Sequence, residues 1–182
     1  MIKLDLLGYV IIFFIIIISI KIYYDTDYFH LTCILSDDNK KTYCVRDRDN
    51  NKKTVGLLKR VDSNIHILVN KIKHDYNDNK FVDRLSKNIK HTRLTETLPN
   101  SKYTAYSENK GEKIAFCMNK NKQSDTIIDY NTLMFVALHE ITHVGTESVG
   151  HDDTFWNNFK FILKEAVKHN IYKPVDYGKT PE

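Results

Sequence analysis

A long apolar stretch near the N-terminus constrains the fold of this chain more than any other feature. Residues 6–20 are all apolar apart from Gly8 and Ser19. A helix over these fifteen residues is about 22 Å long, and extension to Tyr24 gives about 28 Å, close to the ~30 Å hydrocarbon core of a bilayer. Lys21 would extend its charged end to the interface, where Tyr24 would also lie. We therefore predict an N-terminal transmembrane helix and a single-pass membrane protein.

Two other interpretations of this stretch are weaker. A cleaved signal peptide has an apolar core of roughly 7–15 residues, but no small-x-small cleavage site follows in residues 21–25. A buried helix of a soluble protein is disfavoured because residues 10–18 are all β-branched or aromatic. The orientation of the helix stays open, since Lys3 and the α-amino group lie on one side and Lys21 on the other.

The 182 residues are enough for one domain with a sizeable core. The net charge of +4 is distributed over segments of mixed sign, such as 47–49 and 71–75. This pattern favours a solvated surface over a nucleic-acid groove, so we expect no nucleic-acid partner. No oligomeric state follows from the sequence.

The three cysteines leave the redox compartment open. Cys33 and Cys44 can pair in an oxidising compartment, or remain free thiols in a reducing one. Cys117 lies in a predicted strand and resembles a small buried apolar residue.

Three segments are predicted along the chain. Residues 1–24 form the membrane anchor, residues 25–60 a juxtamembrane extended segment, and residues 61–182 the main domain. The middle segment contains two short strands within residues 28–45, followed by a charged loop at 47–53.

The first half of the main domain is predicted to be mixed in structure. Helical spacing indicates one helix beginning near Ser63 and a second over residues 80–89. A hairpin follows, with arms at 103–107 and 113–118, and Gly111 supplies the positive φ that its turn requires.

Two helices are predicted in the C-terminal part. The first covers residues 132–144, with Asn131 as its N-cap, and its apolar residues surround most of the cylinder, so it should be central and buried. Gly145 is expected to end it in a left-handed turn. The last helix begins at position 153 or 154 and ends near Asn170.

The predicted central helix carries a metal-binding pattern, His139-Glu140-Ile-Thr-His143. Because a helix places residues four apart on one face, His139 and His143 can bind one metal ion, with Glu140 beside them. A catalytic zinc usually has three protein ligands and one open position. The third ligand is either His151 or Glu165. We favour His151, since a glycine-containing loop can fold it back, whereas Glu165 should project away from the apolar face of the last helix.

Burial supports a Zn²⁺ site at this position. Unpaired imidazoles and a carboxylate on an otherwise apolar helix would cost several kcal/mol, which coordination offsets. Glu140 would then act as general base towards a water molecule. The histidines without such a context are predicted to be solvated: His30, His66, His74, His91 and His169.

Supporting roles are assigned to four further residues. Tyr172 or Tyr177 is a candidate hydrogen-bond donor to a tetrahedral oxyanion. Asp152 or Asp153 either orients a ligand histidine or favours the positive N-terminus of the last helix.

The chain resembles the WLM and SprT-like group of zinc metallopeptidases. The matching residues are Leu-His-Glu-Ile-Thr-His at 138–143 and Gly-His-Asp-Asp-Thr-Phe-Trp at 150–156. They correspond to the group's His-Glu-x-x-His and its downstream Gly-His-x-x-x-Phe-Trp, and a weaker similarity extends over 103–177. The chain is also similar to small WLM-like proteins of large DNA viruses, a similarity that its Lys-, Asn- and Ile-rich composition fits.

The resemblance implies both a fold and an activity. It implies a compact α+β, minigluzincin-like core, in which a small antiparallel sheet packs on helices. It also implies that His139, His143 and His151 bind zinc and that Glu140 is the catalytic base. The expected function is a membrane-anchored metallopeptidase acting on a protein or peptide substrate, in a virion or a host internal membrane. The alternatives are a structural or assembly protein without turnover and a DNA–protein crosslink protease.

Overall fold

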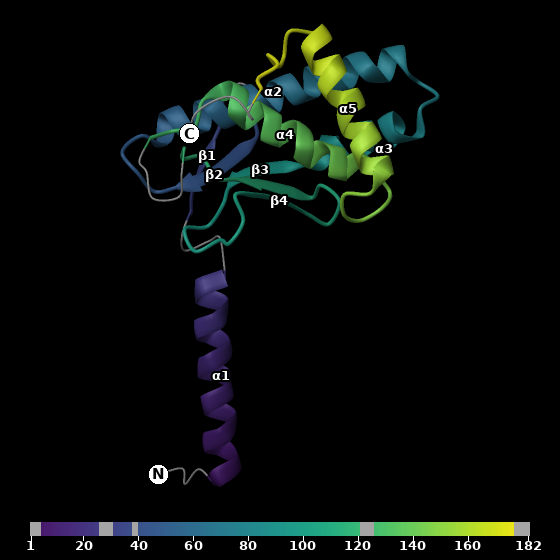
Figure 1. The fold of residues 1–182 in the computed structure, drawn as a ribbon. Coiled ribbons are helices and arrows are strands. Elements are labelled where there is room, and N and C mark those ends of the chain that lie inside the picture. Colours follow the sequence, from purple (N-terminus) through teal and green to yellow (C-terminus); the bar gives the residue numbers. More distant parts are fainter. Residues whose placement is uncertain (1–4, 26–30, 38–39, 121–125, 177–182) are drawn as a thin grey trace.

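Two parts of very different composition make up the fold. The computed structural model describes residues 5–25, 31–37, 40–120 and 126–176. Helix α1 (Leu6–Asp25) extends away from an α+β domain (Figure 1). Its large apolar side chains are 42–81% exposed. Among the described residues, α1 is the single helix that is long and apolar enough to cross a membrane, with a mean hydropathy of 2.5 over Leu6–Tyr24.

The domain contains one five-stranded mixed sheet with the order β1-β2-β3-β5-β4. Two antiparallel hairpins, β1–β2 and β4–β5, flank a central strand that pairs in parallel with β2 and with β5. The strands are β1 (Leu31–Leu35), β2 (Thr42–Arg46), β3 (Arg93–Glu96), β4 (Ala105–Glu108) and β5 (Lys113–Phe116).

The α+β class is confirmed, but the predicted antiparallel sheet is wrong. The difference is β3, a strand of four residues in which Thr95 and Glu96 are buried beside Leu94. Such a strand shows no alternation of apolar and polar residues, so periodicity did not reveal it. Two parallel neighbours require a long crossover, and α2 and α3 supply the one between β2 and β3.

The helices of the domain pack against this sheet and against one another. They are α2 (Asn51–Asp75), α3 (Lys80–Asn88), the short 3₁₀ helix η2 (Ile89–His91), α4 (Tyr130–Gly145) and α5 (Asp153–Lys168). The prediction that the first helix begins near Ser63 is wrong, because α2 already begins at Asn51. Val55 and Leu58 are buried and extend the helical spacing towards the N-terminus. Helix α2 is therefore continuous across residues 60–61.

Both ends of α4 differ from the prediction. The N-cap is Asp129, not Asn131: its carboxylate accepts hydrogen bonds from the backbone N–H of Asn131 (2.9 Å) and of Thr132 (3.0 Å). Gly145 is the last helical residue and does not have a positive φ. A Cβ on Gly145 would lie 2.5 Å from Cε2 of Phe81, so the close approach of α3, and not a left-handed turn, requires glycine here.

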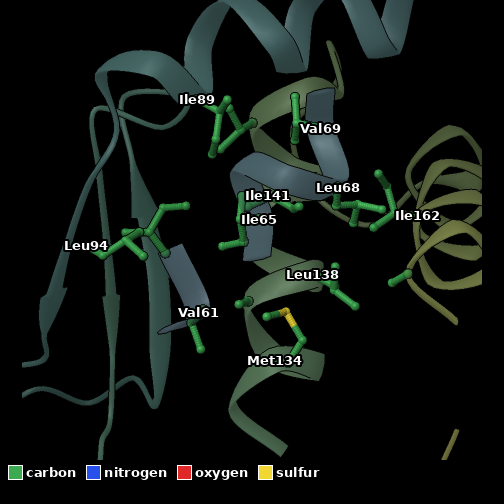
Figure 2. Packing of buried hydrophobic residues seen from close by; sticks show 14 of the residues in the cluster. Val61, Ile65, Leu68, Val69, Ile89, Leu94, Met134, Leu138, Ile141 and Ile162 are labelled. Carbon is green, nitrogen blue, oxygen red and sulfur yellow. The ribbon is translucent and has the colours of Figure 1, made fainter. Parts of the chain in front are cut away.

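Helix α4 is central and buried, as predicted. It contacts α2, α3, α5, β4 and β5. Figure 2 shows Leu138 and Ile141 of α4 among buried residues of α2, such as Ile65 and Leu68, and Ile162 of α5. This packing fixes the helix that carries the metal-binding pattern.

The cysteines and the predicted hairpin are also resolved by the structure. A disulfide joins Cys33 of β1 to Cys44 of β2, which face each other across the hairpin. Cys117 is free and buried, as predicted.

The predicted β4–β5 hairpin is confirmed, and Gly111 in its turn has φ +105°. A Cβ on Gly111 would lie 2.7 Å from Val144, so the turn packs closely on α4.

Candidate metal centre

Three histidines converge at the C-terminal end of α4. Helix α4 presents His139 and His143 one turn apart, and His151 reaches them from the loop before α5, after Gly150 with φ +92°. The Nε2 atom of His151 lies 3.0 Å from Nε2 of His139 and 3.1 Å from Nε2 of His143. The three imidazoles therefore share one small volume.

This arrangement fits a zinc ion. Nitrogens that each lie ~2.0–2.1 Å from one tetrahedral zinc are roughly 3.4 Å apart, close to the observed separations. Three neutral imidazoles that turn the same nitrogen towards one point cannot all satisfy one another by hydrogen bonds, because each such nitrogen is either a donor or an acceptor. A single cation at that point would accept all three lone pairs. The donor set is also the one that zinc prefers.

An aromatic floor from α5 fixes the three rings. Phe155 is fully buried and stacks on His143, with ring centroids 4.3 Å apart. The same phenyl ring lies 5.0 Å from the ring of His139 and 4.6 Å from that of His151. Trp156 stacks on the outer side of His151 at 5.6 Å. The rings are thus held in place by packing, independently of an ion.

Asp152 sets the start of α5 below these rings. Its carboxylate accepts a 2.8 Å hydrogen bond from the backbone N–H of Phe155, and this bond is the largest cause of the lowered pKa of Asp152. The structure therefore supports the helix-capping interpretation of Asp152, whose effect on the site passes through the position of Phe155. Asp153 follows as an exposed residue of the first turn.

Lys110, in the β4–β5 turn, holds the loop that carries His151. Its Nζ donates hydrogen bonds to the backbone carbonyls of Thr146 (3.2 Å), Glu147 (3.2 Å) and Ser148 (2.7 Å). These bonds use all three donors of the ammonium group. Lys110 thereby links the hairpin to the segment between the second and third histidines.

Burial controls the protonation of the site. It lowers the pKa of His139, and it lowers the pKa of His143 to about 4, with further contributions from the charges of His139, His151 and Lys110. His139 and His143 are therefore neutral near pH 7, the form that binds a metal. Burial also raises the pKa of Glu140, whose side chain points into the same region, to about 7.

The histidines and Glu140 line a cleft of about 440 Å³ between α4 and strand β4. Several other lining residues come from the hairpin and the loop, and no chemical pattern in the sequence singled them out: Tyr103, Ala105, Tyr106, Ser107, Lys110 and Val149. The available signal was the predicted hairpin itself, because an edge strand next to a metal-binding helix forms a natural wall of a cleft.

Two residues that the sequence suggested for the site, Glu165 and Tyr172, do not line the cleft. Glu165, the competing third ligand, accepts hydrogen bonds from Tyr76 (2.9 Å) and Lys168 (3.0 Å) on the other side of α5. Tyr172 is buried and packs on Phe135, outside the cleft lining, so its predicted role as oxyanion donor is wrong. Tyr177 lies outside the described residues.

The other histidines separate into two groups. His74 and His91 are exposed, as predicted. The prediction is wrong for His66 and His169, which are half-buried; His66 contacts Lys41 and Asp62. His30 lies outside the described residues.

The fold and the site together define an α+β protein with a histidine cluster of the kind that holds one metal ion. The chain belongs to the WLM domain family, whose family model matches residues 37–179. An uncharacterised protein of Acanthamoeba polyphaga mimivirus is 31% identical over 152 residues, which are 81% of this chain and 77% of the relative. An uncharacterised protein of Invertebrate iridescent virus 6 is 39% identical over 62 residues, 34% of this chain and 35% of the relative. These matches confirm the resemblance to the WLM family and to small viral proteins.

Two solved structures of yeast proteins are similar to part of this chain. Wss1 from S. pombe has a TM-score of 0.45 at 22% identity and covers 67% of this chain and 87% of its own. Wss1 from Saccharomyces cerevisiae has a TM-score of 0.47 at 18% identity and covers 69% of this chain and 88% of its own.

Proposed function

We propose that this chain is a membrane-anchored, zinc-dependent metallopeptidase. His139, His143 and His151 would hold the zinc ion, Glu140 would act as general base, and residues 1–24, which contain all of α1 except Asp25, would be the anchor. The observation that carries the proposal is that Nε2 of His151 lies 3.0 Å from Nε2 of His139 and 3.1 Å from Nε2 of His143, beside a buried carboxylate in an open cleft. Membership in the WLM family supports a metalloprotease-type function.

The zinc ion, Glu140 and the aromatic residues of α5 would have different roles in the hydrolysis of a peptide bond. A bound zinc ion would supply Lewis acidity towards a water molecule and a peptide carbonyl. Glu140 takes the proton of the attacking water and later delivers it to the leaving amine. Its pKa of about 7, raised by burial, suits a group that must both accept and release a proton near neutral pH. The aromatic floor keeps the imidazoles oriented throughout.

The test is a Glu140→Gln variant of the full chain in detergent or vesicles, with a denatured soluble protein as substrate. Glutamine keeps the size of the side chain but cannot accept a proton, so we expect the rate to fall by about 10²–10⁴-fold. Zinc content should stay at one ion per chain, because the three histidines are unchanged. Cleavage products are followed by mass spectrometry, with a chelator-treated wild type as control.

Two outcomes would contradict the proposal. Equal cleavage by wild type and Glu140→Gln would remove Glu140 from the reaction. Zinc binding without any cleavage by the wild type would favour a structural or assembly protein that keeps the fold without turnover.

A further inference from the structure

The cleft of the metal centre continues into a second groove. This groove, about 570 Å³ in volume, is lined by residues of the β3–β4 connection and of β4. Tyr103, Tyr106 and Ser107 line both the groove and the cleft, so the two form one path along β4. Its far end is formed by Leu98 and Asn100.

That far end lies against the anchor. The side-chain amide of Asn100 donates a 3.2 Å hydrogen bond to the backbone carbonyl of Tyr24, at the end of α1. Figure 1 shows the same arrangement, with the β3–β4 connection beside the C-terminal end of α1. The groove therefore runs from the candidate metal centre towards the place where α1 would leave the bilayer.

The exposed residues of this connection suit a membrane surface. Lys102 is exposed, and the side chain of Tyr103 is 66% exposed. Tyrosine and lysine are the residues that tolerate the boundary between headgroups and water, the first through its amphipathic ring and the second through its long stem.

The short connection between α1 and β1 also keeps the cleft close to the bilayer. Residues 26–30 are all that separate α1 from β1. This connection spans at most about 22 Å. A domain of this size is roughly 40 Å across. The cleft must then stay within roughly 60 Å of the bilayer in any orientation, and much closer in the orientation described above.

We infer that the substrates are polypeptide segments next to the bilayer, in proteins that are themselves held in the same membrane, and that the short tether selects them by distance. This inference rests on the proposed peptidase function and on α1 spanning the membrane. The groove receives the chain of the substrate on the membrane side of the metal centre, and a scissile bond far above the bilayer is out of reach.

The experiment places one cleavable peptide at two heights above a membrane. The peptide is taken from the denatured protein that the full chain cuts, so its sequence is known to be accepted. Reporter proteins with a single transmembrane helix carry it either within ten residues of the bilayer or above a helical spacer of about 70 residues, roughly 105 Å long. Each reporter is reconstituted with the full chain in phosphatidylcholine vesicles.

The matched control is a full chain with forty Gly and Ser residues inserted between positions 28 and 29. This tether has a typical span of about 35 Å and a full extension of more than 100 Å, so it brings the far peptide within reach. We expect the native tether to cut the near reporter at least tenfold faster than the far one, and the long tether to reduce this ratio below about threefold. Both chains should cut the denatured soluble protein at the same rate.

Equal cleavage of near and far reporters by the native chain would overturn the inference and leave the peptidase function standing. Cleavage of the soluble protein but of neither reporter would overturn it as well. Loss of all cleavage, including that of the soluble protein, would overturn the proposed function and the inference with it.

Discussion

His151 and Glu165 are the two candidates for the third metal ligand. Both follow the helical His139–His143 pair at distances that occur in zinc proteins, and only the fold separates them. His151 lies 3.0 Å from His139, whereas Glu165 is held by Tyr76 and Lys168 on the far side of α5. The sequence argument against Glu165 was wrong: we expected it to project away from the apolar face of α5, whereas it is buried with that face and accepts hydrogen bonds from Tyr76 and Lys168.

Substitution of His151 should lower zinc affinity, whereas substitution of Glu165 should leave it almost unchanged. Loss of groups that merely orient a ligand usually lowers metal affinity by 10–100-fold, so His151→Ala, which removes a direct ligand, should lower it by more than about 100-fold. Glu165→Gln keeps the shape of its side chain and should leave the affinity within about threefold of the wild type. Competition with a chromophoric chelator measures both. A drop in affinity for Glu165→Gln alone would exchange the roles of the two residues.

Lys110 acts at the same scale but through the backbone. Its side chain donates three hydrogen bonds to backbone carbonyls of the loop that carries His151. Because methionine cannot donate these bonds, Lys110→Met should loosen that loop. We expect zinc affinity to fall by about 10–100-fold, as for other groups that orient a ligand. Lys110→Arg should restore part of the loss. Lys164→Met, at an exposed position of α5, is the matched control and should change nothing.

Zinc affinity and the free energy of unfolding, measured together, separate a positioning role of Lys110 from a general loss of stability. If Lys110→Met and the control both leave the free energy of unfolding of the metal-free protein unchanged, yet Lys110→Met alone loses zinc affinity, the effect belongs to the site. Unchanged zinc affinity in Lys110→Met would exclude a positioning role.

At the level of elements, α2 and the β1–β2 hairpin are joined by a buried charge. Asp62 of α2 accepts hydrogen bonds from Lys41 Nζ (2.8 Å) and from the hydroxyl of Tyr43 (2.7 Å), and it pairs with His66. Burial alone would raise the pKa of Asp62, but the hydrogen bonds from His66, Lys41 and Tyr43 outweigh it, so the pKa is lowered. The charged form of Asp62 is thus stabilised by folding.

This lowered pKa gives a pH-dependent prediction. The stabilisation by Asp62 is present above the unfolded pKa of about 3.9 and is lost as the pH falls through the lower folded value. Asp62→Asn should lower the free energy of unfolding by about 2–3 kcal/mol at pH 7, because a buried charged acceptor is lost. The difference from wild type should narrow below about pH 4. Urea unfolding in detergent at both pH values measures it, with the exposed Asp78→Asn as control.

Elements with a strong local signal were predictable, and elements defined by their neighbours were not. The apolar composition of α4 and the spacing of His139 and His143 are local, and they correctly predicted a buried helix with both histidines on one face. Strand β3 is too short for a pattern and is defined by its pairing with β2 and β5. Gly145 suggested a turn by its type, whereas its actual constraint is the ring of Phe81, which arrives from α3.

At the scale of the whole molecule, the long N-terminal helix followed from composition, and the α+β class followed from the resemblance to the WLM and SprT-like group. The mixed sheet did not, because a parallel pair joins segments far apart in sequence: Cys44 pairs with Thr95. The cleft could not be predicted for the same reason. Its walls come from β4, α4 and the loop before α5, and no single stretch of sequence contains them.

If α1 anchors the chain in a membrane, as proposed, the disulfide between Cys33 and Cys44 has a mechanical consequence. Any pull on the anchor enters the domain at Leu31, the first residue of the edge strand β1, and begins to unzip it from β2. The covalent link stops this peeling after two residues and passes the tension to β2, an inner strand of the sheet. Drag on a captured substrate or bending of the membrane would therefore stretch the connection to the anchor before it frays the sheet.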